Sequence, residues 1–384
     1  MPFLERSRMS LKLEFVTQAI QENGNIARLC RRYGITRRTG YKWLRRFQDE
    51  GAAGLRDCSR RPHSSPARTS ASTESHIIKL REKNPAWGGR KLKHRLEAQG
   101  LSGIPSASTI TEILWRHDLI NPSEAAKHAP WKRFEYEAPN DLAQMDFKGH
   151  FPVGQLRCHP LTMLDDHSRF LLVLQACVDE RMETVKSCLT VAFRRNGLPR
   201  AILTDNGPPW AHPRSERSLT KLGVWLIRLG VELKRSRPCH PQTMGKDERL
   251  HRSLKAEVIQ GRTFQDFDEC QKEFDRWRHV YNYERPHEAL EMGVPGSRYR
   301  ESPRDFPETM PEIEYSPGDF VRKVQQKGII HFKGGEYHVG ASLVGQPVAV
   351  RPTLEDGVYD VYYCRQKISK INQHPGSPMG EPGC

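Results

Sequence analysis

The hydrophobic residues change their spacing along the chain, and this excludes a single uniform fold. They recur at helical intervals in residues 10–50, form runs typical of buried strands in residues 142–178, and are divided among short strands and Gly turns in residues 319–364. With 384 residues, the chain is also longer than one ordinary domain. The sequence therefore predicts a multidomain α/β protein.

Residues 1–58 are predicted to form a helix-turn-helix domain of three helices. Gly34 makes the turn before the third helix, and Thr36 is its expected N-cap. This third helix exposes a row of cations, namely Arg37, Arg38, Lys42, Arg45 and Arg46. In such motifs the N-terminal residues of this helix contact bases in the major groove. We expect Arg37 and Arg38 to read DNA sequence and the other three to bind phosphates, the alternative being a three-helix bundle with another role.

The charge of the chain also indicates a polyanionic partner. The net charge is +15, and residues 1–70 contain fifteen Lys and Arg against six Asp and Glu. A merely solvated surface would not explain why the excess lies at one end. Nucleic acid is the usual partner of a chain with such a charge.

Polar segments rich in Ser and Pro divide the rest of the chain into domains. Residues 59–75 are expected to be a flexible basic linker. Residues 76–125 are predicted to be a second helical domain that binds DNA, with a plain helical spacer as the alternative, and Ser106 or Ser108 caps one of its helices. The remaining expected units are an α/β core at 126–300, a small β-barrel at 315–370 and a disordered tail at 371–384.

Within the core, strands are expected at 142–151, 161–166, 170–178, 201–204 and 231–234. An amphipathic helix follows the third strand, and a second helix covers about 264–284. The second helix carries a stripe of Phe267, Cys270, Phe274, Trp277 and Tyr281. This stripe is expected to pack on its own core, with a seam to a partner helix as the alternative. Five short strands are expected in the barrel.

Membrane and zinc sites are not expected. No hydrophobic run approaches the length of a membrane span, and the first residues lack the hydrophobic core of a signal peptide. The nine Cys form no C-x-x-C pair and no disulfide framework. We therefore expect a cytoplasmic protein with reduced thiols and no zinc.

Three carboxylates stand out by their context. Asp146 lies within a strand in LAQMDFKGHF, Asp205 ends a strand in AILTDNG, and Glu248 lies near the start of a helix in HPQTMGKDERLHRSLK. Polar sites in α/β folds gather at strand ends. Three acids brought together would repel one another without a cation, and carboxylate oxygens are the ligands that Mg²⁺ prefers. Their spacing alone does not establish such a site.

The chain resembles the DDE-type insertion-sequence transposases, which have a retroviral-integrase-like catalytic core. The resemblance lies in QMDFKGHF, LDDHSRF, LTDNGPP, HPQTMGKDERLHRSL and YNYERPHEAL, in this order, and extends to the flanking domains. It implies an RNase H-like core, a mixed five-stranded sheet flanked by helices. It also implies that Asp146, Asp205 and Glu248 are the catalytic, metal-binding triad, holding two Mg²⁺ ions, with Mn²⁺ as an alternative.

Three other acids compete for the metal. Asp247 precedes Glu248, but neighbouring helix residues point about 100° apart, so only one can face the metal. The family pattern, an acid directly before Arg, selects Glu248. Asp165 and Asp166 are expected to have a structural role at the HSR turn instead. The 43 positions between Asp205 and Glu248 exceed those in the commonest members, which leaves the intervening loop in doubt.

Further polar residues are expected around the triad. Lys246, His251 and Lys255 share the region of Glu248, where cations suit a DNA phosphate. We predict that Lys246 and Lys255 bind DNA. Asn206 and His240 are candidates for positioning the strand that is cut.

The resemblance implies DNA strand cleavage at the ends of an element and transfer of the resulting 3′-OH into target DNA. The expected partners are the terminal inverted repeats, the target DNA and further copies of the chain assembled on DNA, and no membrane. The expected location is the cytoplasm of a bacterium, associated with the nucleoid. Two alternatives are a plain RNase H-like nuclease and a catalytically inactive, transposase-derived DNA-binding regulator.

Overall fold

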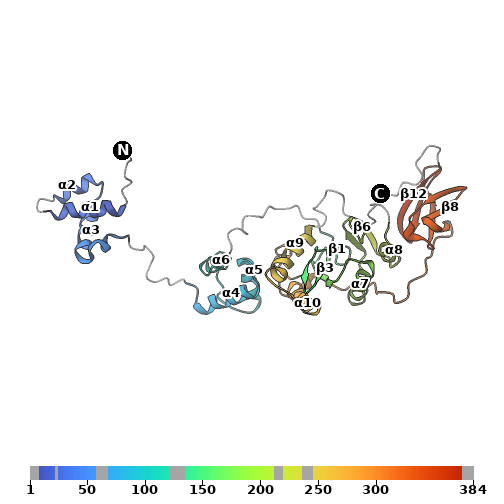
Figure 1. The fold of residues 1–384 in the computed structure, drawn as a ribbon, viewed down its shortest axis with the longest axis horizontal. Coiled ribbons are helices and arrows are strands. Elements are labelled where there is room, and N and C mark those ends of the chain that lie inside the picture. The colour runs from blue at the N-terminus through green and yellow to red at the C-terminus, as the bar shows by residue number, and fades with distance from the viewer. Residues whose placement is uncertain are drawn as a thin grey trace. The chain divides into compact units, whose positions relative to one another are not determined.

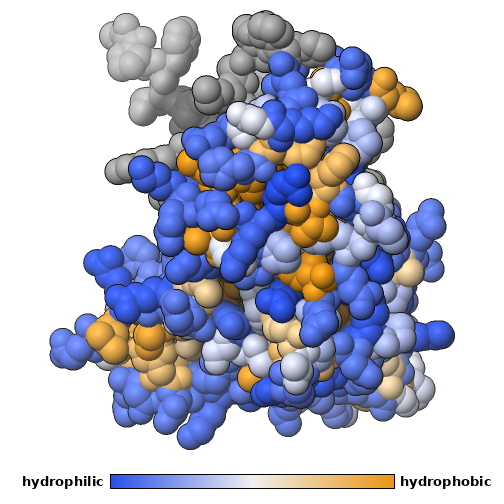
Figure 2. Space-filling view, turned by 90° about the vertical axis from the view of Figure 1, so that its right-hand side faces the viewer, coloured by the Kyte–Doolittle hydropathy of each residue, from blue (hydrophilic) through white to orange (hydrophobic). Residues whose placement is uncertain are grey.

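The computed structural model describes residues 8–21, 25–57, 68–120, 135–211, 219–235 and 245–373. The chain divides into two units, Met1–Arg68 and Thr69–Cys384. None of the helices in the described ranges combines the length and hydrophobicity needed to cross a membrane. Hydrophilic side chains cover most of the face drawn in Figure 2, and hydrophobic ones show between them in patches.

The first unit is the predicted helix-turn-helix domain (Figure 1). Thr36 caps the third helix, since its Oγ1 accepts a hydrogen bond of 3.2 Å from the Thr39 amide. Gly40 allows the helices to approach closely, because a Cβ there would lie 2.7 Å from Cys30 Sγ and 2.9 Å from Phe15 Cζ. The helices are α1 (Arg8–Ile20), α2 (Ile26–Arg32) and α3 (Arg37–Glu50), followed by η1 (Gly51–Leu55).

The second unit begins with three helices, namely α4 (Ala71–Lys83), α5 (Gly89–Ala98) and α6 (Ala107–Arg116). The linker predicted for 59–75 is wrong in its last residues, because α4 already begins at Ala71. Ser70 fixes this start by accepting a hydrogen bond of 3.1 Å from the Thr73 amide. Ser106, one of the two expected caps, accepts from the Thr109 amide in the same way. Residues 58–67 of the linker region lie outside the described residues.

A mixed sheet forms the centre of the core. Its strands are β1 (Ala143–Phe147), β2 (Phe151–Val153), β3 (Leu156–Asp165), β4 (Leu171–Cys177), β5 (Ala201–Thr204) and β6 (Glu232–Arg235). The strand order is β2-β3-β1-β5-β6, with β4 also paired to β3. β3 is antiparallel to both β1 and β4, whereas β1, β5 and β6 run parallel. The predicted mixed five-stranded sheet is therefore present, with β2 as a short sixth strand.

The single strand expected over 142–151 is wrong, because the chain breaks between β1 and β2. Gly149 has a φ of 76°, which is outside the extended region. The Lys148 amide still bonds to the Pro160 carbonyl at 3.0 Å, so both short strands follow β3. The break ends β1 one residue after Asp146.

Helices cover both faces of the sheet (Figure 1). One hydrophobic core lies under α7 (Met182–Asn196) and α8 (Lys221–Arg228), and another under α9 (Gly245–Leu254) and α10 (Phe267–Tyr283). The predicted stripe of α10 belongs to the second core, where Phe274 is fully buried. This confirms packing on its own core rather than a seam to a partner helix. Short helices continue the fold: η4 (Lys255–Ile259), η5 (Glu288–Leu290) and α11 (Pro295–Arg298).

The C-terminal part is an antiparallel β domain. Its strands are β7 (Phe320–Lys323), β8 (Ile329–Phe332), β9 (Gly335–His338), β10 (Pro347–Pro352), β11 (Val358–Tyr363) and β12 (Gln366–Asn372). The described strands form a four-stranded sheet, β12-β11-β10-β7, and a β8-β9 hairpin around one core, with no closed ring of pairing. β12 was not predicted. The tail expected from residue 371 is wrong for its first two residues, and residues 374–384 lie outside the description.

Candidate active site

Asp146 lies at the edge of the sheet where β1 ends. It pairs in register with Thr162 of β3, and its side chain is 29% exposed. β5 is the parallel neighbour of β1, and Asp205 directly follows β5. The carboxyl ends of parallel strands meet at one edge, so the fold brings Asp146 and Asp205 to the same side. Asp205 Oδ1 accepts a hydrogen bond of 3.1 Å from the Gly207 amide, which fixes the turn after the strand.

Glu180 is an acid at this edge that the sequence analysis missed. Because β4 is antiparallel to β3, as β1 is, the carboxyl end of β4 meets the same edge, and Glu180 follows that end closely. Its negative charge raises the pKa of both Asp146 and Asp205. Its Oε1 lies 2.7 Å from His159 Nδ1. The signal in the sequence was the DER stretch directly after a buried strand.

The acids at this edge crowd one another. Burial and the nearby Asp205 carboxylate raise the pKa of Asp146 to about 7, and Glu180 and Glu248 add to the effect. Burial, followed by Glu180, raises the pKa of Asp205. Such a cluster is unfavourable when fully ionised, and a divalent cation would relieve it.

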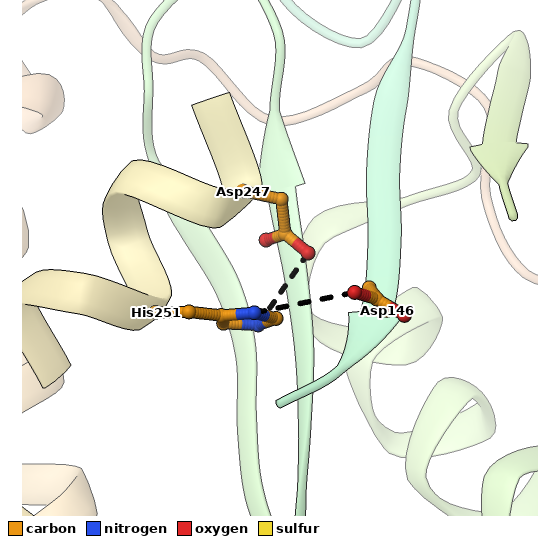
Figure 3. A group of neighbouring side chains, drawn as sticks. All are labelled: Asp146, Asp247 and His251. Carbon is orange, nitrogen blue, oxygen red and sulfur yellow. Dashed lines mark ion pairs between the residues drawn. The ribbon is translucent and has the colours of Figure 1, made fainter. Parts of the chain in front are cut away.

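A polar network joins α9 to the strands beside Asp146 (Figure 3). The Thr162 hydroxyl lies 3.0 Å from the Asp146 carbonyl oxygen, 3.2 Å from Asp247 Oδ1 and 2.8 Å from His251 Nε2. His251 Nε2 is 3.5 Å from Asp247 Oδ2, and His251 Nδ1 is 4.0 Å from Asp146 Oδ2. Among the described residues, Asp146, Asp247 and His251 are therefore the group whose ligand atoms could share one metal ion.

Asp247 is nevertheless poorly suited to bind a metal that must also touch a substrate. It is 0% exposed, and burial followed by the charge of Asp146 raises its pKa well above the ordinary value. The Thr162 hydroxyl has a single proton, which it donates either to Asp247 or to the Asp146 carbonyl oxygen. Burial lowers the pKa of His251 to about 3, which keeps its imidazole neutral. These groups fit a clamp that holds α9 to the sheet.

Glu248 lies on the exposed side of α9. Its charge still raises the pKa of both Asp146 and Asp247, so the three carboxyl groups interact electrostatically. The structure does not place Glu248 within the compact group formed by Asp146, Asp247 and His251. Of the two acids in the first turn of α9, Glu248 is the exposed one and Asp247 the buried one. The role of Glu248 in metal binding stays a prediction.

The structural role predicted for Asp165 and Asp166 is confirmed by their hydrogen bonds. Both are fully buried. Asp165 accepts from the Asn140 amide at 2.7 Å and from the amide and hydroxyl of Ser168. Asp166 accepts from the Tyr136 amide and from Gln144 Nε2. These bonds occupy the carboxylate oxygens and fix the turn between β3 and β4.

Lys246, which is predicted to contact DNA, is instead paired within the protein. Its Nζ lies 2.5 Å from Asp166 Oδ2 and donates to the Asp166 carbonyl oxygen at 3.1 Å. Lys246 therefore compensates a buried carboxylate and anchors the start of α9. Lys255 is exposed, and its contact with DNA stays a prediction; Asn206 lies half-buried next to Asp205. His240 is outside the described residues.

The cations of α3 also differ in their surroundings. Arg37, Arg38, Lys42 and Arg45 are exposed, as predicted. The fifth, Arg46, is half-buried, and its Nη2 donates to the Arg56 carbonyl oxygen at 3.2 Å. The prediction that Arg46 is exposed is wrong, because this hydrogen bond holds its guanidinium against the backbone that follows η1.

The raised pKa of Asp146 predicts a pH-dependent affinity for divalent cations. In the metal-free protein this carboxyl is protonated below about pH 7, so a cation must displace the proton. We expect the affinity for Mn²⁺ to be about tenfold lower at pH 6 than at pH 8. Calorimetric titration at both pH values measures this, and equal affinities would contradict the assignment. Without metal, the stability of the protein has the opposite pH dependence to the metal affinity. The stabilisation that this carboxyl contributes is complete below its unfolded-state pKa near 4 and is lost as the pH rises through 7.

Comparisons with known proteins agree with this architecture. Family models match residues 11–63 as a helix-turn-helix domain, 39–114 as a homeodomain-like domain, 136–241 and 229–295 as integrase core domains, and 319–377 as the C-terminal domain of IS481 family transposases. They confirm the predicted fold class. The chain therefore carries the integrase core and the C-terminal domain of a DDE-type insertion-sequence transposase, which confirms the resemblance.

Two relatives come from insertion elements. An uncharacterized 31.7 kDa protein of element IS407 from Burkholderia multivorans is 28% identical over 160 residues, which is 41% of this chain and 54% of the relative. An uncharacterized 39.2 kDa protein of IS476 from Xanthomonas euvesicatoria is 24% identical over 230 residues, 58% of this chain and 63% of the relative. The chain thus spans between half and two thirds of these relatives.

Solved integrase structures show more distant similarity. The catalytic core domain of HTLV-2 integrase in complex with magnesium is 14% identical with a TM-score of 0.32, and the match covers 42% of this chain and 98% of that one. The simian T-cell lymphotropic virus intasome is 14% identical with a TM-score of 0.37, covering 80% of this chain and 98% of that one.

Proposed function

We propose that this protein is a DNA transposase that cleaves DNA at the ends of an element and transfers the 3′-OH into target DNA. The observation that carries the proposal is the set of acids at one sheet edge, Asp146 and Asp205 with Glu248 on the adjoining helix. They lie in a chain that also has an integrase core and N-terminal helix-turn-helix domains. A plain nuclease would have no use for these flanking domains.

The three acids would hold the divalent cation that this chemistry requires. We propose Mg²⁺, as two ions, with Mn²⁺ as a substitute. The residues fit such a cation, since all three offer hard oxygen ligands and the raised pKa of Asp146 reports their crowding. When bound, the cations stabilise the attacking and leaving oxygens of a phosphoryl transfer.

The chain's own residues hold the acids in place. Asp247 and His251 contact the Thr162 hydroxyl, which in turn lies against the Asp146 backbone. Lys246 anchors the start of α9 on Asp166. No side chain has to act as a covalent nucleophile, since a water molecule and then the DNA 3′-OH supply the attacking oxygen.

Joining of DNA distinguishes this proposal from its rivals. The full chain is incubated with Mg²⁺, a labelled duplex that carries a terminal repeat of its element, and a supercoiled plasmid. We expect labelled strands covalently joined to the plasmid, and mass photometry of the assembled complex should show at least two copies of the chain holding two ends. Cleavage without joining would indicate a nuclease, and binding without either reaction a regulator.

Recognition of the element ends is proposed to depend on the start of α3. Replacing Arg37 and Arg38 by Ala should remove about 1–3 kcal/mol of sequence discrimination for each base contact that is lost. Competition between end duplex and random duplex at fixed salt measures this. Replacing the exposed Arg45 should instead weaken binding to both duplexes alike. Unchanged preference in the Arg37 and Arg38 variants would place specificity elsewhere in the chain.

A further inference from the structure

A cationic cavity of about 740 Å³ lies where the beginnings of α5 and α6 meet α9. Its lining includes Arg90 and Lys91 of α5, Ser108 of α6 and Arg249 of α9, together with one carboxylate, Glu288. Arg249 is the residue after Glu248, so the cavity borders the helix that carries the proposed catalytic acid. It is separate from the group formed by Asp146, Asp247 and His251.

Gly89 allows α5 and α6 to approach each other closely. A Cβ at Gly89 would lie 2.4 Å from the Ala107 carbonyl oxygen and 2.6 Å from Thr111 Oγ1. Gly88, the N-cap of α5, provides no side-chain acceptor for the first amides of the helix. The first residues of α5 line the cavity, and no capping side chain satisfies their amides, as at helix starts that bind phosphate.

Positive charges outnumber negative ones in the lining of the cavity. Among the described residues, the side chains of Arg90, Lys91 and Arg249 form no ion pair or hydrogen bond with another residue. Burial, followed by the cations of Arg285 and Arg249, lowers the pKa of Lys91 to about 8, although Glu257 and Glu288 act in the opposite direction. Arg285 itself already pairs with Glu257 at 3.3 Å. Cations crowded in this way are stabilised by an anion placed among them.

The helices that line the cavity are fixed to the core. Arg95 of α5 forms an ion pair of 2.7 Å with Glu284, directly after α10. Val280 of α10 packs against the hydrophobic core of α4–α6. The cavity is thus held in one position relative to α9.

We propose that this cavity binds one backbone phosphate of the element-end DNA and thereby guides that DNA past α9. The inference rests on the proposed function and extends it by giving the second helical domain a role in holding the substrate beside the acids. Lys91 and Arg249 supply the charge, and the amides at the start of α5 supply directed donors. Arg90 and Ser108 also line the cavity and offer further donors.

Lys91→Gln and Arg249→Gln test the cavity, with Lys79→Gln as the matched control. Lys79 is an exposed cation of α4 outside the lining. In the full chain, each cavity variant should bind the end duplex about tenfold more weakly, and the slope of log affinity against log salt should fall by about 0.9. Lys79→Gln should change neither, and Lys91→Arg should restore binding.

Single methylphosphonates in the end duplex identify the phosphate. One neutral position should weaken binding of the unmodified chain about tenfold and have no further effect on Lys91→Gln. Independent losses at every position would overturn the cavity as a phosphate site. Failure of the acid variants to stop joining would overturn the proposed function but not this result, because binding is measured without catalysis.

Discussion

Glu248→Gln is expected to abolish strand cleavage and joining, a loss of at least about a thousandfold, while binding to the end duplex is retained. The substitution removes one negative charge with little change in shape. Asp146→Asn and Asp205→Asn should have the same effect, because each removes a charged ligand from the same sheet edge. Gel-based joining assays and DNA-binding titrations on the same preparations measure both quantities.

Asp247→Asn is the matched control for Glu248→Gln. Asparagine keeps a side-chain oxygen that accepts from the Thr162 hydroxyl, and Asp247 is fully buried, away from any substrate. We therefore expect joining within about tenfold of the unmodified chain. Loss of joining in Asp247→Asn with full activity in Glu248→Gln would assign the metal to the compact group of Asp146, Asp247 and His251.

Lys246→Met should lower the free energy of unfolding by about 3–5 kcal/mol, because it leaves the buried Asp166 carboxylate without its cation. Asp166 is 0% exposed, and the side chain of Lys246 is only 16% exposed. Urea denaturation monitored by tryptophan fluorescence measures the change. Adding Asp166→Asn to Lys246→Met should recover part of the loss, since no buried charge then remains.

Lys255→Met is the control for this effect. Lys255 is exposed and follows the same helix, so its replacement should change stability by less than about 0.5 kcal/mol. It should instead weaken DNA binding, as predicted from the sequence. If Lys246→Met left stability unchanged and weakened DNA binding, Lys246 would be a DNA contact after all.

Much of the fold follows from local sequence signals. Thr36 and Ser106 cap helices where the sequence places them, and the buried run of β4 and the short β5 lie where their hydrophobic residues predict them. β12 escaped prediction because its hydrophobic residues, Ile368 and Ile371, are three positions apart and do not show the alternation expected of a strand.

The candidate site was less predictable, because its chemistry depends on contacts between distant segments. The DER stretch after β4 places Glu180 near a strand end, but its nearness to Asp146 depends on β4 running in the same direction as β1, which the sequence does not show. Lys246 and Asp166 are 80 positions apart and meet only when α9 docks on the sheet. The helix periodicity shows that Asp247 and Glu248 face different directions, but it does not say which one faces inward. The structure shows that Asp247 does.

Binding of Mn²⁺ to the full chain, counted by electron paramagnetic resonance in the presence of end duplex, tests the central claim most directly. The claim is that Asp146, Asp205 and Glu248 form the metal site. We predict that the unmodified chain and Asp247→Asn bind the same number of ions, whereas Glu248→Gln and Asp205→Asn bind fewer or bind far more weakly. Undiminished binding by Glu248→Gln and Asp205→Asn, with loss in Asp247→Asn, would contradict it.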